Sequence, residues 1–234
     1  MPASGNEAGV ARISIIESIK EDMLAFEKNF PLDSLQRTNF GQEPLITLLT
    51  CSDSRVPLYV FGETFNRIFS VENIGNQVKT SEGSILYGLL HLHTPFMLIV
   101  GHSDCGALKA AMSDYSGEPG AIARELDNVK KSLHEIQSSA YTLREEPSVK
   151  YTQLAELNVD MQVNYMLANT AVARLVEEGS LSIIGIILDL HNVYGQGYGK
   201  SYLINHNGVR NLQQLQQIKE LKGLAARMQR LTAV

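Results

Sequence analysis

Residues 95–106, PFMLIVGHSDCG, decide the fold class, because a short apolar run ends there in a glycine and a cluster of polar side chains. An apolar run of this length, bounded by Pro95 and Gly101, is typical of a strand buried on both faces of a parallel sheet. Three more such runs occur at 45–49, 68–71 and 181–188. The sequence therefore predicts four parallel strands.

Helical patterns separate these strands. In 81–93 the apolar residues Ile85, Leu86, Leu89 and Leu90 recur at helical spacing, which makes a strand, helix, strand unit. Further helices are expected at 10–30, 121–138, 151–178 and 211–232. We predict one α/β domain over 1–234, with a mostly parallel central sheet flanked by helices. Residues 1–10 are expected to be flexible, and 11–30 to form a helical arm that packs on a partner subunit.

Composition and charge exclude several classes of protein. Of the 234 residues, 44% are hydrophobic and 19% charged, which is ordinary for a globular chain and unlike a disordered one. The net charge of −5 offers no global positive field for nucleic acid. No apolar run approaches the roughly 20 residues that a bilayer crossing needs, and residues 1–10 do not resemble a secretory signal. We expect a cytoplasmic protein that binds neither nucleic acid nor membrane.

Both cysteines of the chain follow predicted strands. Cys51 alternates with Asp53 and Arg55 along extended chain, so these three side chains point to one side, and His102 and Cys105 lie in the turn after 95–100. Sites in open α/β sheets form at the carboxyl ends of the strands. Two thiolates and one imidazole that converge there are the number of ligands a catalytic zinc takes while it keeps a position for water. Asp53, kept ionised by Arg55, is a candidate base, and it is also the nearest candidate for a fourth ligand.

Other interpretations of these residues stay open. Each of them alone is more often structural, as a small buried thiol, a core histidine or a surface ion pair. A metal-free thiolate activated by His102 or Asp53 is a second catalytic hypothesis, and a disulfide is a third interpretation. His191 and His206, in a region rich in Gly, Asn and Tyr, could carry protons, although a surface role is the commoner explanation.

The segments CSDSRVP (51–57) and GHSDCGA (101–107) resemble the signature pair of the β-class carbonic anhydrases. The resemblance implies a zinc enzyme that hydrates CO2 reversibly to bicarbonate and a proton by a metal-bound hydroxide. It implies Cys51, His102 and Cys105 as zinc ligands and Asp53 with Arg55 as a catalytic dyad. In some members the aspartate takes the fourth zinc position in a closed state, so Asp53 is either a ligand or a catalytic group.

The resemblance extends over roughly 13–190 and implies further site residues. Gln42, Phe65 and Tyr87 match family positions that contact the substrate or line its channel, and these can come from the partner subunit. A homodimer or a dimer of dimers is therefore implied, with CO2 and bicarbonate as the small-molecule partners. One departure is Glu72, where many members have arginine. Two alternatives remain: hydrolysis of a CO2 analogue such as carbonyl sulfide or carbon disulfide, and a zinc-binding subunit without catalysis.

Overall fold

A computed structural model describes residues 5–137 and 141–233 of the chain. The chain divides into two compact units, residues 1–42 and 43–234, which are described separately. The first unit holds helices α1 (Gly5–Lys28) and α2 (Leu32–Arg37). Helix α1 begins earlier than the arm expected at 11–30, and residues 1–4 lie outside the described part. Its apolar residues are more than half exposed: Ile15, Ile16, Ile19, Met23, Leu24 and Phe26.

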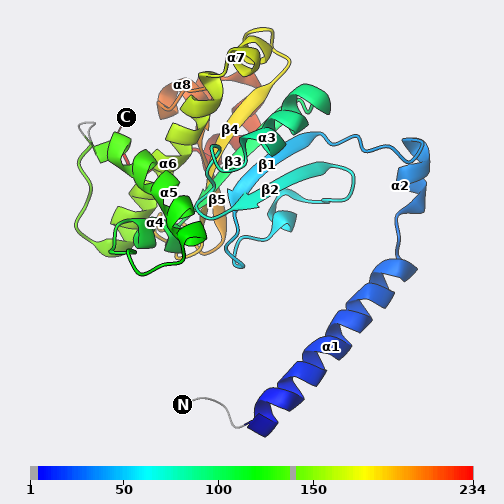
Figure 1. Ribbon diagram of the computed structural model, residues 1–234. Coiled ribbons are helices and arrows are strands. Elements are labelled where there is room, and N and C mark those ends of the chain that lie inside the picture. Colours follow the sequence, from blue (N-terminus) through cyan, green and yellow to red (C-terminus); the bar gives the residue numbers. More distant parts are fainter. Residues whose placement is uncertain (1–4, 138–140, 234) are drawn as a thin grey trace. The chain divides into compact units, whose positions relative to one another are not determined.

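The second unit is built on a five-stranded sheet (Figure 1). Its strands are β1 (Ile46–Cys51), β2 (Ile68–Asn73), β3 (Phe96–His102), β4 (Ser182–Asp189) and β5 (Lys200–His206). The order is β2-β1-β3-β4-β5, in which the first four strands are parallel and β5 is antiparallel to β4. The predicted mostly parallel sheet is confirmed.

Strand β5 is not among the four strands that the sequence predicts. Its sequence, KSYLINH, has polar residues at both ends and only a short apolar centre, so it lacks the continuous apolar run of the other strands. Gly195, Gly197 and Gly199 precede it with positive φ angles, and they form the turn that brings β5 back along β4.

Helices fill the connections between strands and follow the last strand. They are η1 (Leu58–Phe61), α3 (Glu82–Leu86), the π-helix η2 (Tyr87–His91), α4 (Gly106–Ala111), α5 (Gly120–Gln137), α6 (Pro147–Leu167), α7 (Thr170–Glu177), α8 (Leu212–Gln217) and η3 (Lys219–Arg227). The single helix expected at 151–178 is two helices, because the first ends at Leu167 and Asn169 caps the second by accepting from the N–H groups of Ala171 and Val172. Within the described residues no helix is both long and apolar enough to cross a membrane.

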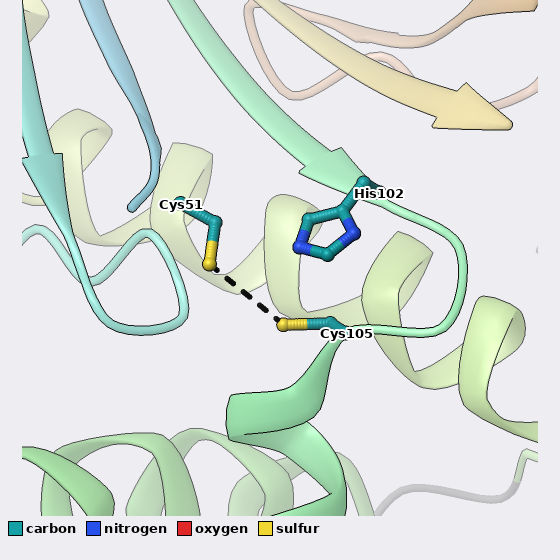
Figure 2. Close-up of side chains that lie close together, drawn as sticks. All are labelled: Cys51, His102 and Cys105. Carbon is teal, nitrogen blue, oxygen red and sulfur yellow. Dashed lines mark hydrogen bonds between the residues drawn. The ribbon is translucent and has the colours of Figure 1, made fainter. Parts of the chain in front are cut away.

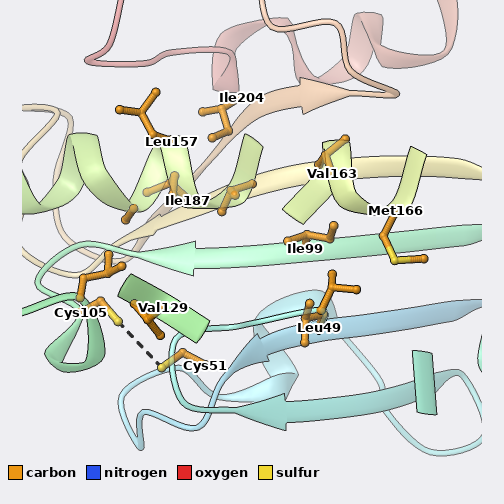
Figure 3. Close-up of a cluster of buried hydrophobic side chains, with 14 of the residues drawn as sticks. Leu49, Cys51, Ile99, Cys105, Val129, Leu157, Val163, Met166, Ile187 and Ile204 are labelled. Atoms are coloured by element: carbon orange, nitrogen blue, oxygen red, sulfur yellow. Dashed lines mark hydrogen bonds between the residues drawn. The ribbon is translucent and has the colours of Figure 1, made fainter. Parts of the chain in front are cut away.

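Two apolar clusters cover the two faces of the sheet, as the alternation of side chains along a strand requires. Leu49 and Ile99 belong to the cluster that packs against α5 and α6 (Figure 3), whereas Leu48 and Leu98 belong to the cluster on the opposite face. Helix α6 lies very close to β3 and β4, because Gly101 and Gly185 leave room for Val159. A Cβ atom at either glycine would lie within 3 Å of a Val159 methyl group.

A buried carboxylate in α6 holds the end of the described chain. Glu156 is fully buried and accepts hydrogen bonds from the Tyr194 hydroxyl at 2.5 Å, from the Leu231 N–H at 2.7 Å, and from both the N–H and the hydroxyl of Thr232. One turn further along α6, Asp160 accepts from Arg230 at 2.8 Å. Burial raises the pKa of Glu156, and the charge of Arg230 and the four donors offset only part of that rise.

Candidate metal centre

The structure brings the three predicted ligands together (Figure 2). Cys51 ends β1, His102 ends the neighbouring strand β3, and Cys105 lies three residues further on, immediately before α4. All three side chains are buried, and their ligand atoms lie within 4.8 Å of one another. The two sulfur atoms are 4.0 Å apart and the thiols are free, so the two cysteines do not form a disulfide.

The donor set fits a zinc ion. Tetrahedral zinc with Zn–S bonds near 2.3 Å places two sulfur ligands about 3.8 Å apart, close to the observed separation. The Nδ1 atom of His102 lies 3.0 Å from the carbonyl oxygen of Ser103, which fixes the ring. Its Nε2 atom is buried and has no hydrogen-bond partner among the described residues. A buried nitrogen without a partner is costly unless an ion takes up its lone pair.

The two thiols influence each other strongly. The pKa of Cys51 is lowered, chiefly because the Cys105 thiol hydrogen-bonds to it and further because His102 and the N–H of Gly75 favour its thiolate. The same contact and burial raise the pKa of Cys105. The N–H groups of Leu108 and Ala107 lower this pKa, but by less. Two thiolates this close need a cation to neutralise them, and a divalent metal provides that charge.

Asp53 and Arg55 form a forked ion pair beside the ligands. Arg55 donates from Nε to Oδ1 of Asp53 at 2.9 Å and from Nη2 to Oδ2 at 2.8 Å, and its backbone N–H also donates to Oδ1 at 3.0 Å. These bonds hold the pKa of Asp53 well below its usual range. Oδ2 of Asp53 also lies 3.7 Å from Nε2 of His102, so the carboxylate borders the ligand set.

Two further residues support the turn that carries the ligands. Ser103 joins the ends of β3 and β4, because its N–H donates to the Leu188 carbonyl and its hydroxyl accepts from the Leu190 N–H. Asp104 adopts a left-handed conformation with φ 60°, which aspartate tolerates better than most residues. Both residues lie within GHSDCGA (101–107), but the sequence pattern alone indicates no role for them.

Asp104 is surrounded by cationic side chains. It accepts from Lys109 and from Arg55, and His191 lies 3.7 Å from its Oδ2 atom. Burial raises the pKa of Asp104, but Lys109, His191 and Arg55 together lower it overall. The contact with His191 spans a large separation in sequence, so no local pattern could have indicated it.

Two of the expected substrate-contact residues, Phe65 and Tyr87, lie away from the ligands within one chain. Because Ile46 pairs with Ile68 and Cys51 pairs with Asn73, Phe65 lies before the end of the sheet that is opposite to Cys51. Tyr87 stacks near Phe69 at that same end, with ring centroids 6.0 Å apart, and is 44% exposed. Gln42 is exposed and belongs to the first unit, and Glu72 is exposed on β2.

Comparisons with known proteins agree on one family. Residues 46–196 match the family model described as carbonic anhydrase. The chain is 25% identical over 173 residues to carbonic anhydrase 2 of Mycobacterium tuberculosis, which covers 72% of this chain and 78% of that protein. It is 26% identical over 209 residues to the carbonic anhydrase of Candida albicans, covering 82% and 72%. A solved tetrameric β-carbonic anhydrase from Sordaria macrospora has the same fold, with a TM-score of 0.64, 22% identity, and 83% and 98% of the two chains covered.

Proposed function

Because this chain belongs to the β-class carbonic anhydrase family, a family of lyases, we propose that it hydrates CO2 reversibly to bicarbonate and a proton with a zinc ion held by Cys51, His102 and Cys105. The observation that carries the proposal is the convergence, at neighbouring strand ends, of two free thiols and an imidazole nitrogen that has no hydrogen-bond partner in the described part of the chain. When bound, zinc would supply a nucleophile from water near neutral pH, because it lowers the pKa of water.

Asp53 and Arg55 are proposed to position the reacting groups. The fork from Arg55 keeps Asp53 ionised and holds its carboxylate next to His102. In that position Asp53 can accept a hydrogen bond from water and so direct the water's lone pair toward CO2. To become a fourth zinc ligand instead, Asp53 would have to give up its hydrogen bonds with Arg55.

Arg55→Ala and Asp53→Ala are each expected to slow hydration by roughly 10² while zinc stays bound. Removing Arg55 raises the pKa of Asp53 toward its ordinary value, which is still far below pH 7, so the loss would report positioning and not protonation. Stopped-flow rates and metal analysis on the same samples measure both effects.

Arg174→Ala is the matched control, because it breaks a comparable arginine–carboxylate pair, with Glu178 at 2.7 Å, on the exposed surface of α7. Its rate should equal that of the unmodified protein. Loss of zinc from Asp53→Ala would contradict the positioning role and assign Asp53 to the metal.

The proposal as a whole is tested by stopped-flow CO2 hydration at pH 7 and pH 8.5, with the zinc content of the same sample. Zinc near one ion per chain with fast hydration supports it. Zinc without hydration contradicts it, and the sulfur analogues carbonyl sulfide and carbon disulfide would then be assayed. A protein that binds zinc and turns over none of these substrates would be a non-catalytic subunit.

We further propose that the chain assembles as a homodimer or a dimer of dimers in the cytoplasm. The exposed apolar residues of α1 support a subunit contact, and the similar protein from Sordaria macrospora is tetrameric. Phe65 and Tyr87, far from Cys51 in their own chain, are proposed with Gln42 to reach the site of the partner subunit. The free thiols support a reducing compartment.

A further inference from the structure

We propose that His191 carries the proton that CO2 hydration releases from the metal centre to the solvent. This inference rests on the proposed function, because hydration of each CO2 molecule to bicarbonate yields one proton that has to leave the site. An imidazole with an ordinary pKa can accept and release a proton between pH 6 and 8.

His191 is placed at the boundary between the site and solvent. It follows β4, and the hydroxyl of Ser103, the residue after the ligand His102, lies 3.2 Å from its Nδ1 atom. Its backbone N–H donates to Asp189 at 3.1 Å, which fixes the main chain beneath the ring. The side chain is 40% exposed. The ring is therefore held against the ligand turn on one side and open to water on the other.

A continuous series of polar contacts joins His191 to the metal centre. Nε2 of His191 lies 3.7 Å from Oδ2 of Asp104, and the same oxygen accepts from Nη1 of Arg55 at 3.5 Å. Arg55 in turn holds Asp53, which borders His102. Water molecules bound beside this series would have charged groups to hydrogen-bond along its length.

The charges around the ring suit a group that gains and loses a proton. The Asp104 carboxylate faces the His191 ring, the Ser103 hydroxyl is its neutral partner, and Asp189 accepts from the backbone N–H of His191. Lys109 and Arg55 pair with the same Asp104 carboxylate. Protonation of His191 converts its contact with Asp104 into an ion pair. Lys109 and Arg55 also neutralise the charge of Asp104, which weakens this ion pair and lets the ring release its proton again.

The proposed transfer is balanced. The proton released by hydration passes through water to the unprotonated ring nitrogen of His191, where an N–H bond forms and an O–H bond of the delivering water breaks. The imidazolium then gives the same proton to a buffer base in solution and returns to its neutral form. No electrons are exchanged and no co-reactant other than water and buffer is needed.

His191→Ala tests the proposal on the zinc-loaded protein. In dilute buffer we expect kcat for hydration to fall about tenfold or more, and kcat/KM to stay unchanged, because the proton leaves after CO2 has been converted. Adding imidazole should restore kcat. In the unmodified protein, the NMR signal of labelled histidine that is missing from His191→Gln should change with pH over the same range as kcat.

His134→Ala is the matched control, because His134 is an exposed histidine in α5. Its kcat should not change. The proposal is overturned if His191→Ala keeps its full kcat at every buffer concentration, if kcat and kcat/KM fall together without rescue by imidazole, or if the NMR signal of the His191 ring does not follow the pH dependence of kcat. Absence of hydration in the unmodified protein would instead refute the proposed function.

Discussion

Replacing Cys105 by serine is expected to remove zinc and to lower CO2 hydration by at least about 10³-fold, a larger loss than the 10–100-fold typical of residues that only support a ligand. Serine has nearly the same shape, but its hydroxyl stays protonated and is a poor ligand for zinc. Chelation of the unmodified protein should have the same effect, reversed by added zinc. Metal analysis and stopped-flow rates measure both losses.

Ser113→Ala is the control. Ser113 is exposed and lies just after helix α4, which begins directly after Cys105, and the variant should keep zinc and activity. The competing hypothesis is a metal-free thiolate nucleophile. Activity that survives chelation but is lost on alkylation of the thiols would favour it and contradict the zinc site. Circular dichroism should show that the chelated protein stays folded, because the ligands stand on the ends of paired strands and not on a loop that zinc must order.

Replacing Glu156 by alanine is expected to lower the free energy of unfolding by about 3–5 kcal/mol. The substitution leaves a cavity and removes the acceptor for two backbone N–H groups and two hydroxyls, and each buried group without a partner costs about 1–3 kcal/mol. Urea unfolding followed by circular dichroism measures the change. Glu177→Ala, at an exposed position in α7, should stay within about 0.5 kcal/mol of the unmodified protein.

The pH dependence of stability gives this prediction a second readout. Because the pKa of Glu156 is raised in the folded protein, the folded state binds this proton more tightly than the unfolded chain does. The contribution of the group is therefore greatest below its ordinary pKa and is lost as the pH rises through the raised value. Glu156→Gln should remove this component of the pH profile. An unchanged profile would show that Glu156 has the same pKa in the folded and unfolded states and would contradict this prediction.

The sequence predicted the ligand set but not what surrounds it. Cys51, His102 and Cys105 follow continuous apolar runs, and the rule that parallel strands end at one edge of a sheet brings them together. The contacts of His191 with Asp104 and of Glu156 with Thr232 join segments far apart in sequence. No periodicity or motif describes such pairs, because they depend on how completed elements pack.

The same difference explains where the predicted secondary structure differs from the observed one. Strands that contain a short apolar run have a strong apolar signal, and four of them were predicted. Strand β5 is stabilised largely by its pairing with β4, and the break at Asn169 depends on a single capping side chain. Both features follow from hydrogen bonds and not from hydrophobic pattern.

Gly101 and Gly185 determine how closely helix α6 packs on strands β3 and β4 beside the metal centre. Any larger side chain at either position would displace Val159, and with it the helix that carries Glu156. Sequence variation during evolution or in the laboratory is therefore constrained far beyond the residues that bind metal. Exposed positions tolerate substitution far better than this layer, where one added carbon atom at either glycine would press on helix α6, whose Glu156 holds Leu231 and Thr232.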